Sequence, residues 1–489
     1  MRRNVTNFIQ RLRGQSAGNG PEFDDENLPD AKDRQYLVRL LLDIEDNLPV
    51  NEIMLEGVRL WPLVRLQIGL AFKKTHLSPE PTSSSTSANQ ATTVRDDGFP
   101  TDAEQRKALN RTHRASLPRE PDKLQALLED QWAMLSEHAQ PDFLILSKIE
   151  KYYQRVGSRR FAPVLDPVHE DLAARGKSLT VALEPLDFAC VNEPVRVDVA
   201  PHMIATSKWP KVSDDQALRQ MNEIQAYLRS VNSSVSISPE GVIDRFNRLR
   251  RRAAFFRQMF ETLAPRAIFM SSFTGWHAAV WAARQLGIPT VDIQHGGQTA
   301  YHHTNTHFGD MPEEGYVFLP DYFWLWGDMN RDFIAKWLPG NAERHVPLVG
   351  GNRNIAKWYR DRDEGKLADA DKAFLEACVD APNLVLVTLG NTADKLLPDE
   401  LLQAMGASPE LNWLVRLHPN KRDADTRDVI KRELEGAGCT AFDVDAPTDV
   451  RLHTVLSVSR HHVTPFSTSG REAAAFGVPT TICHAIGAK

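Results

Sequence analysis

The repeated alternation of strand-length apolar runs with helical segments near the end of the chain most constrains its fold. Five strands are predicted there, at residues 384–389, 413–417, 441–444, 461–464 and 480–483. Segments with helical character separate them, at residues 398–405, 424–434, 449–456 and 469–476. Strands that alternate with helices predict a parallel sheet covered on both faces.

A similar alternation precedes this one, which indicates two domains of the same class. Its strand candidates lie at residues 142–147, 178–183, 267–270, 290–293 and 323–326, and residues 346–351 look like a crossover between the two halves. We therefore expect an α/β protein with two doubly wound, Rossmann-like domains and a cleft between them. Ligands of such sheets bind beyond the carboxyl ends of the strands.

The length of 489 residues allows two or three domains at roughly 100 to 200 residues each. Residues 1–101 are predicted to be an N-terminal extension, with short helices at 36–48 and 53–72 and a disordered linker at 78–101. A helical connector is expected at residues 102–140. The first Rossmann-like domain then takes residues 141–345, and the second takes residues 346–489.

Composition excludes several classes of function. A formal net charge of -6 argues against a general nucleic-acid binder, because affinity for a polyanion requires clustered Lys and Arg. The four cysteines are far apart and form no metal-ligand spacing, which favours reduced thiols in a cytoplasmic protein. No apolar run approaches the roughly 20 residues that span a bilayer. Residues 1–13 are compatible either with a basic amphipathic helix on anionic lipid or with a frayed terminus.

A histidine follows the strand predicted at residues 413–417. Arg416 ends that strand region, His418 and Pro419 stand at its edge, and Lys421 follows. Such a histidine can donate to a phosphate oxygen, and as imidazolium it offsets charge on a departing phosphate. The alternative is a histidine bonded to a neighbouring loop carbonyl.

Three hydroxyl residues, Ser467, Thr468 and Ser469, precede the last predicted helix. One would suffice as a helix cap, whereas three together with the first-turn amides favour an anion site. Glu472 lies in the first turn and could accept hydrogen bonds from ribose hydroxyls. Gly390 and Asn391 form a third such edge, where glycine permits close approach of a ligand to the backbone.

The first domain offers candidates for a catalytic base. Asp292 and His295 lie at the end of the strand predicted at 290–293, and either could remove a proton from an acceptor hydroxyl. Glu313 and Glu314 are further acids in the loop that follows. Three histidines between residues 301 and 307 invite a metal site, but a polar lid explains them equally well, and no metal is predicted.

At these strand ends the sequence resembles the GT-B glycosyltransferases of bacterial capsule and surface-polysaccharide assembly, and the resemblance covers roughly residues 140–489. The resembling motifs are Gln294-His295-Gly296, Arg416-Leu417-His418-Pro419, Ser467-Thr468-Ser469 with Glu472-Ala473, and Gly477-Val478-Pro479. A His-Pro dipeptide followed by a Ser/Thr pair is similar to the nucleotide-monophosphate site of sialyltransferases, Kdo transferases and CDP-glycerol phosphotransferases. GT-B folds usually finish with a helix that returns to the first domain, and none is predicted after residue 483.

The resemblance implies roles for individual residues. His418 would contact the donor phosphate, Ser467 and Thr468 would complete its cradle, and Glu472 would reach the nucleotide sugar. The first domain would bind the acceptor and the second the nucleotide. Within the first Rossmann-like domain, residues 141–345, the acidic Asp/Glu-Asp/Glu-Gly signature of the family occurs only at Glu313-Glu314-Gly315, so Glu314 and Asp292 are both candidates for the base.

The resulting prediction is a Leloir-type GT-B glycosyltransferase. It would move a sugar from a nucleotide-activated donor, with CMP favoured, to a bacterial surface or capsular polysaccharide or a lipid-linked glycan. No tightly bound cofactor, metal or nucleic acid is expected. The expected location is the cytoplasm. A peripheral contact with the inner face of the membrane or with polysaccharide assembly proteins is compatible with this prediction. The alternatives are a CDP-glycerol-type polyol phosphotransferase and a catalytically silent GT-B scaffold in an assembly complex.

Overall fold

The computed structural model describes most of the chain from residue 34 to residue 483. The described ranges are 34–72, 121–147, 154–156, 159–183, 189–197, 210–232, 234–296, 302–338, 343–390, 396–419, 421–465 and 467–483. The basic segment 1–13, the linker predicted at 78–101 and Asn391 lie outside these ranges. None of the helices within them is long and apolar enough to cross a membrane.

The first domain is built on a seven-stranded sheet in which all neighbouring strands are parallel. Its strands are β3 (Phe143–Ser147), β6 (Ser178–Ala182), β7 (Val195–Arg196), β8 (Ala267–Ser271), β9 (Thr290–Ile293), β10 (Tyr322–Leu325) and β11 (Val346–Val349). The spatial order is β11-β10-β9-β8-β3-β6-β7. The strands that follow β3 in this sheet are first added on one side of it, as β6 and β7, and then on its other side, from β8 to β11. This reversal of the strand order next to β3 is typical of a doubly wound fold.

Helices cover both faces of this sheet, as the alternation of its strand residues requires. Leu144 and Leu146 of β3 belong to one buried cluster and Ile145 to another on the opposite face. The first cluster includes residues of α8 (Pro239–Leu263) and α9 (His277–Gln285), and the second includes residues of α6 (Asp166–Ala173). The remaining described elements between residues 121 and 349 are α5 (Pro121–Ser136), α7 (Asp215–Val231), α10 (Asp328–Trp337), the 3-10 helix Phe273–Gly275 and the hairpin of β4 (Gln154–Val156) and β5 (Arg159–Phe161).

The second domain has a five-stranded parallel sheet in the order β14-β13-β12-β15-β16. The strands are β12 (Leu384–Thr388), β13 (Asn412–Arg416), β14 (Phe442–Asp443), β15 (His461–Thr464) and β16 (Thr480–Ile482). Counted from β12, this is the order 3-2-1-4-5 of a Rossmann sheet, with its switch point between β12 and β15. The prediction of two doubly wound α/β domains is confirmed.

Alternate residues of β12 again pack on opposite faces. Val385 and Val387 join a cluster with α13 (Asp399–Gly406) and α14 (Ala424–Gly436). Leu384 and Leu386 pack on the face of α12 (Asp369–Cys378), α16 (Leu452–Val458) and α17 (Ser469–Ala475). The short α15 (Asp445–Asp449) connects β14 to α16.

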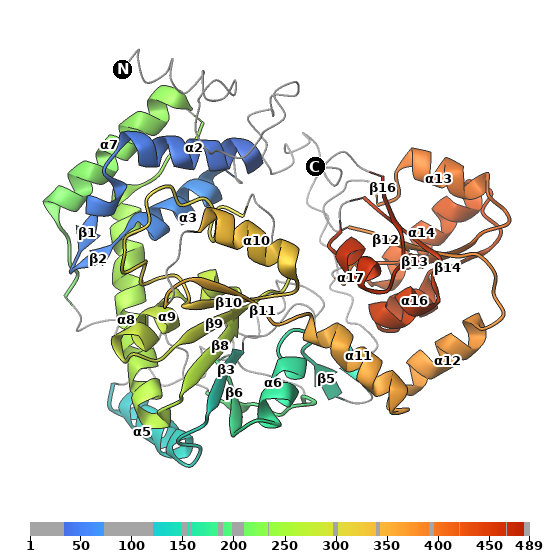
Figure 1. Cartoon of the computed structure of the whole chain (residues 1–489), viewed down its shortest axis with the longest axis horizontal. Coiled ribbons are helices and arrows are strands. Elements are labelled where there is room, and N and C mark those ends of the chain that lie inside the picture. Colours follow the sequence, from blue (N-terminus) through green and yellow to red (C-terminus); the bar gives the residue numbers. More distant parts are fainter. Residues whose placement is uncertain are drawn as a thin grey trace.

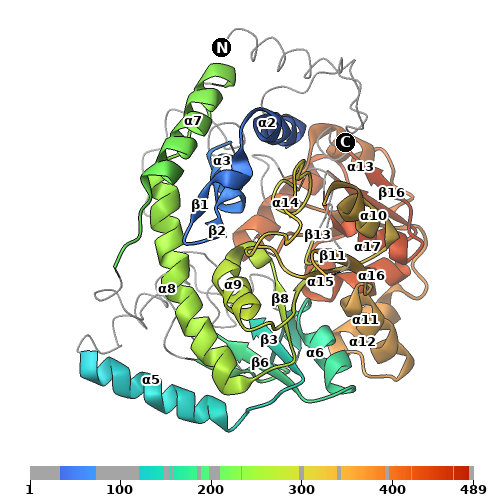
Figure 2. The same cartoon turned by 60° about the vertical axis from the view of Figure 1, so that its left-hand side comes forward.

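The N-terminal segment is part of the first domain's core and not a separate appendage. It contains α2 (Arg34–Asn47), the 3-10 helix Val50–Glu52, the hairpin of β1 (Met54–Leu55) and β2 (Val58–Arg59), and α3 (Trp61–Phe72). Leu40, Trp61 and Phe72 are fully buried in the same cluster as α8 and α9. Figure 2 shows α2 and α3 beside α7 and α8. The sequence predicted a helix at 36–48 and a second compact segment with helical character at 53–72, and the structure shows that both pack into the first domain's core.

The crossover between the domains begins later than predicted, because residues 346–349 form the edge strand β11 of the first sheet. The turn that follows requires glycine: a Cβ on Gly350 would lie 2.0 Å from the ring of Trp324, and Gly351 has a φ of +78°. Asn352 then caps α11 (Arg353–Asp363) by accepting from the amide of Asn354 at 3.1 Å. Figure 1 shows α11 where the two domains meet.

Helix α11 contacts both domains. Trp358 is fully buried, packs edge-on against Phe476 and donates from Nε1 to Oγ1 of Thr454 at 2.9 Å. On its other side Lys357 forms an ion pair of 3.0 Å with Glu170 of α6. A single helix thus links the helical layer of the second domain to α6 of the first.

Candidate functional site

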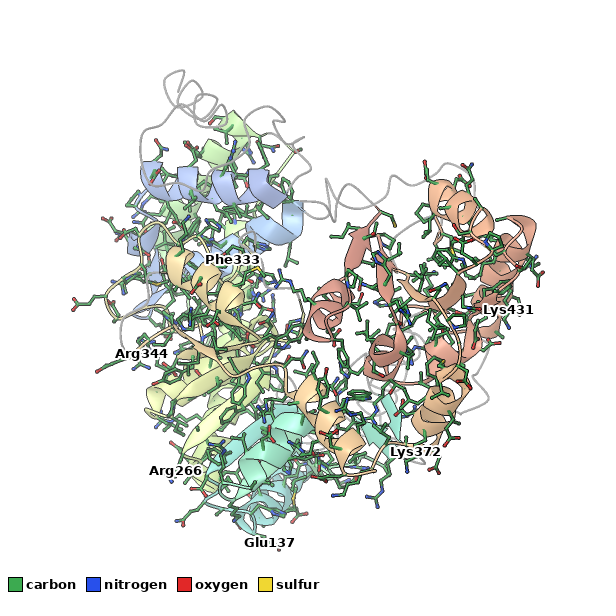
Figure 3. All side chains as sticks on the ribbon, turned by 45° about the vertical axis from the view of Figure 1, so that its right-hand side comes forward. Glu137, Arg266, Phe333, Arg344, Lys372 and Lys431 are labelled. Atoms are coloured by element: carbon green, nitrogen blue, oxygen red, sulfur yellow. The ribbon has the colours of Figure 1, made fainter. Side chains whose placement is uncertain are left out.

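A cavity of about 200 Å³ lies between the carboxyl ends of the two sheets. Its first-domain wall comes from the ends of β9 and β10 and the start of α6, and its second-domain wall from the ends of β12 and β13 and the starts of α16 and α17. The β11–α11 connection, with Asn352 and Arg353, closes one side. Figure 3 shows the side chains of the two domains, with Arg344 and Lys431 on opposite outer edges. The cavity occupies the position in which open α/β sheets bind ligands.

His418 lines the second-domain wall directly after β13 and is half-buried. Burial lowers the pKa of His418 below its ordinary value, and the charge of Arg422 lowers it further. The lowered pKa favours the neutral imidazole near pH 7, and an anionic ligand would favour its protonation. Pro419 lines the cavity beside it and Lys421 is exposed outside the lining.

Arg416 also reaches the cavity lining, but its guanidinium is anchored within the protein. Its Nη1 donates to the carbonyl oxygen of Val450 at 2.7 Å and to that of Pro447. Burial and, to a smaller extent, the charge of the neighbouring Arg422 lower the pKa of Arg416 to about 9. Arg416, which the sequence analysis assigned to phosphate binding, therefore uses Nη1 to stabilise the chain from α15 to the start of α16. Arg422 is a second cation in the lining, and the sequence prediction did not include it.

Glu472 faces the cavity from the first turn of α17 and is held by His453. Nε2 of His453 lies 2.9 Å from Oε1 of Glu472, and the imidazole stacks on Phe476 with ring centroids 5.8 Å apart. His453 itself is buried at 2% exposure. One carboxylate oxygen is thus fixed by the protein, which orients the other for hydrogen bonds from a ligand.

The hydroxyl turn before α17 lines the cavity with Ser467, Thr468 and Ser469. Its first amides are used within the protein: Ser469 donates to Oγ of Ser467 at 3.2 Å, Gly470 to the carbonyl of Ser467 at 3.4 Å and Arg471 to that of Thr468 at 3.0 Å. Thr468 occupies the cap position without a capping hydrogen bond from its side chain. The predicted cradle of free backbone amides is therefore wrong for these three groups, and the turn offers its hydroxyls instead.

Gly390 directly follows Leu389, a lining residue at the end of β12, but is not itself part of the lining. The last residue of β12, Thr388, does line the cavity and is 5% exposed. Oγ1 of Thr388 lies 2.8 Å from Oγ of Ser469 and 2.9 Å from Nε2 of His462. These contacts connect the cavity surface to a buried histidine.

His295 is the titratable residue of the first-domain wall among the described lining residues. It is accessible to solvent inside the cavity, yet the surrounding protein atoms desolvate it and lower the pKa of His295. The backbone beside it is fixed by Gln294, whose Oε1 accepts from the amide of Trp326 at 2.8 Å and whose Nε2 donates to the carbonyl of Gly296 at 2.8 Å. A neutral imidazole is thus presented to the cavity.

Asp292 and Glu314 do not belong to the cavity lining. Asp292 is 3% exposed within β9 and accepts from the amide of Phe273 at 2.9 Å. Burial raises the pKa of Asp292 to about 8, although amide donors oppose this shift. Glu314 is exposed and pairs with Arg59 of the N-terminal segment. Of the three predicted base candidates, the structure places only His295 in the cavity.

The histidine loop after His295 is bound by the N-terminal segment. Arg65 is 1% exposed and donates to the carbonyls of His303 at 3.0 Å and Thr306 at 3.0 Å, as well as to that of His307. Its guanidinium pairs with the buried Glu45. Within the described ranges no group of three His, Cys, Asp or Glu side chains is arranged to hold a metal ion.

Comparison with known proteins yields structural similarity only. No protein-family model matches the chain, and no curated protein matches its sequence. MnaA of S. aureus, solved with UDP, is 13% identical over 70% of this chain and 78% of its own, with a TM-score of 0.40. UDP-GlcNAc 2-epimerase from Neisseria meningitidis, bound to UDP-GlcNAc, is 12% identical over 70% of this chain and 82% of its own, with a TM-score of 0.38.

The wall teichoic acid polymerase TagF, soaked with CDPG, is 10% identical over 78% of this chain and 79% of its own, with a TM-score of 0.37. At these identities the three similarities concern the arrangement of the fold and not the activity. The chemistry of the cavity has to be derived from its own residues.

Several lining residues were missed by sequence reasoning. Arg353 and Asn352 follow the two glycines of the crossover, Arg422 lies four residues after His418, and Trp326 follows β10. Thr388 could have been found from its position as the last residue of a buried strand. The arginines carried no comparable signal, since single cations in polar loops are common on any surface.

Proposed function

We propose that this protein is a GT-B glycosyltransferase that binds a nucleotide-activated sugar in the cavity between its two domains. The observation that carries the proposal is the division of chemistry across the cavity. The second-domain wall holds His418, Arg422 and hydroxyl groups suited to phosphate, together with the oriented carboxylate of Glu472. The first-domain wall holds His295 opposite them.

Each part of a nucleotide sugar has a matching group. His418 and Arg422 would offset phosphate charge, with Ser467, Thr468 and Ser469 completing the contacts. Glu472 would accept from ribose or sugar hydroxyls through the oxygen that His453 leaves available. Because these cations can meet the charge of the phosphate, the proposal includes no tightly bound metal. The resemblance of the His-Pro and Ser/Thr motifs to nucleotide-monophosphate sites favours a CMP-linked donor.

His295 is proposed as the catalytic base in preference to Asp292 and Glu314. Its neutral imidazole can take the proton of an acceptor hydroxyl while that oxygen bonds to the anomeric carbon of the donor. The bond between that carbon and the phosphate oxygen breaks, and the electron pair leaves with the nucleotide. The acceptor proposed is a bacterial surface glycan, free or lipid-linked.

A binding panel tests the nucleotide site directly. Titration calorimetry with CMP, CDP, UDP, CMP-sialic acid, CDP-glycerol and UDP-GlcNAc should show one preferred nucleotide. His418→Ala should weaken its binding by roughly 10- to 100-fold, as expected for loss of a charge-assisted hydrogen bond. Lys372→Ala, an exposed change on α12 of the same domain, should leave the affinity unchanged. Absence of binding to every compound would contradict the proposal.

The same panel separates the alternatives. Preferred binding of CDP-glycerol over every nucleotide sugar would replace glycosyl transfer by polyol phosphate transfer. For the preferred donor, His295→Gln should lower the rate of donor turnover by roughly 100-fold or more while nucleotide affinity stays within about threefold. Turnover that chelation abolishes and manganese restores would overturn the metal-free part of the proposal. Nucleotide binding without turnover of any donor would indicate a silent scaffold.

A further inference from the structure

A buried chain of hydroxyls and one imidazole runs from the cavity through the second sheet. Ser469 and Thr388 lie on the cavity surface, 2.8 Å apart between their hydroxyl oxygens. Nε2 of His462 lies 2.9 Å from Oγ1 of Thr388 and 3.4 Å from Oγ of Ser469. On its far side Nδ1 of His462 lies 3.1 Å from Oγ1 of Thr480.

The fold places these four residues in line. Thr388 ends β12, His462 lies on the adjacent β15, and Thr480 opposes His462 across the pairing with β16. Ser469 opens α17, the helix that follows β15. His462 is fully buried and Ser469 is 5% exposed, so water competes little for these hydrogen bonds.

Because each hydroxyl and the neutral imidazole carry one proton each, the hydrogen bonds of this row can point in only two directions. Burial lowers the pKa of His462 to about 4, with His461 adding to the shift, so the imidazole is neutral at pH 7 and carries one N–H. If Nδ1 carries it, His462 accepts from Thr388, Thr388 accepts from Ser469, and the Ser469 proton points inward. If Nε2 carries it, every donor points toward the cavity.

Only the second arrangement suits an anionic ligand. With Nε2–H, His462 donates to Thr388, Thr388 donates to Ser469, and the Ser469 hydroxyl proton is left for the ligand. The longer contact from Nε2 to Ser469 fits the same tautomer, because both hydroxyl oxygens then accept from one N–H. The turn also needs such a donor, since the amides of residues 469–471 already donate within the protein.

We propose that His462 is a positioning residue whose Nε2–H tautomer orients Thr388 and Ser469 so that Ser469 donates its hydroxyl proton to a phosphate of the ligand. This inference rests on the proposed function, because it assigns the ligand an anionic group at this wall. Thr480 completes the chain by donating to Nδ1. His462 thus acts on the ligand through two hydroxyls, without touching it.

The tautomer can be measured in the protein without any ligand. In a ¹⁵N-histidine-labelled sample, the long-range ¹⁵N–¹H spectrum should show Nε2 of His462 protonated and Nδ1 unprotonated at pH 7. The signals are assigned by their loss in His462→Gln, and His461→Gln identifies the neighbouring ring. A protonated Nδ1 would overturn the inference.

Binding tests the middle of the chain. Thr388→Val keeps the side-chain shape but removes the hydroxyl, and the affinity for CMP by calorimetry should fall roughly 3- to 10-fold. The matched control is Thr481→Val, which removes an exposed hydroxyl that contacts His461 at 2.8 Å and should change the affinity less than about twofold. The circular dichroism of both variants should match that of the parent. An unchanged affinity in Thr388→Val would overturn the proposed hydrogen-bond relay from His462 through Thr388 to Ser469.

The two proposals fail in different ways. CMP binding combined with a protonated Nδ1, or with an unaffected Thr388→Val, overturns the relay and leaves the nucleotide site standing. Failure of CMP and every other panel compound to bind overturns the proposed function. In that case the measured tautomer of His462 alone tests the direction of hydrogen-bond donation: Nε2–H supports the relay, and Nδ1–H overturns it.

Discussion

The two walls of the cavity are supported in different ways. On the second-domain wall, Ser469, Glu472 and Arg416 are held by residues of the same domain, through Thr388, His453 and the carbonyl of Val450. On the first-domain wall, His295 belongs to a strand end whose following loop is bound by Arg65, from a segment more than 200 residues earlier. A cavity wall formed by one domain can therefore keep its geometry while the opposing wall changes.

Removing the buried cation of the N-terminal segment should have the largest effect. Arg65→Met leaves the carboxylate of Glu45 buried without its partner, which should lower the free energy of unfolding by about 3 to 5 kcal/mol. Burial already raises the pKa of Glu45, and the charge of Arg65 opposes that shift. Urea unfolding measures the loss. Calorimetry at a temperature where the variant is folded should show nucleotide affinity within about threefold of the parent.

The control for this change is Arg257→Met on α8, which removes an exposed ion pair with Glu261. It should cost only about 0.3 to 0.5 kcal/mol. A loss below about 1 kcal/mol in Arg65→Met would show that the first wall does not depend on the buried pair. A large loss of nucleotide affinity in the same variant would show that the two walls are not independent.

The buried acid beside the first wall should give the protein a pH-dependent stability. Because the pKa of Asp292 is raised to about 8, the folded state keeps a proton that the unfolded chain loses near pH 4. Stability should therefore fall as the pH rises from about 4 to about 8, by up to about 1.4 kcal/mol per pH unit. Asp292→Asn, which can still accept from Phe273, should flatten this slope in urea unfolding without changing nucleotide affinity.

Glu314 provides the opposite case for comparison. A backbone hydrogen bond and the pairing with Arg59 hold the pKa of Glu314 below its ordinary value, so its small contribution is lost as the pH falls. Glu314→Gln should leave the slope between pH 5 and pH 8 unchanged. Equal slopes for Asp292→Asn and the parent would mean that Asp292 is ionised in the folded protein.

Weakening the contact between the walls should have the smallest effect. Asp171 of α6 pairs with Arg353, and its Oδ1 lies 3.4 Å from Arg360, in partly exposed positions. Asp171→Asn should cost between about 0 and 1 kcal/mol in urea unfolding, and less at high salt. Since Arg353 also lines the cavity, a gain in nucleotide affinity beyond about threefold would show that Asp171 competes with the ligand for this arginine.

The sequence by itself determined the class of the fold and the place of the second wall. Periodic apolar runs predict parallel strands, and parallel strands bring their carboxyl ends to one edge, so His418 and the turn at Ser467–Ser469 had to lie near each other. The same reasoning brought His295 to the facing edge. These inferences need only local patterns and the geometry of a parallel sheet.

Only the tertiary structure decided which side chains face the cavity and which partners they have. Asp292 points into the first domain, Arg416 is anchored to carbonyls 31 and 34 residues away, and His462 connects β12 to β16. The N-terminal helices joined the first core for the same reason. Hydrogen bonds and buried apolar contacts form between residues that are distant in the chain, and no local pattern records which of them will meet.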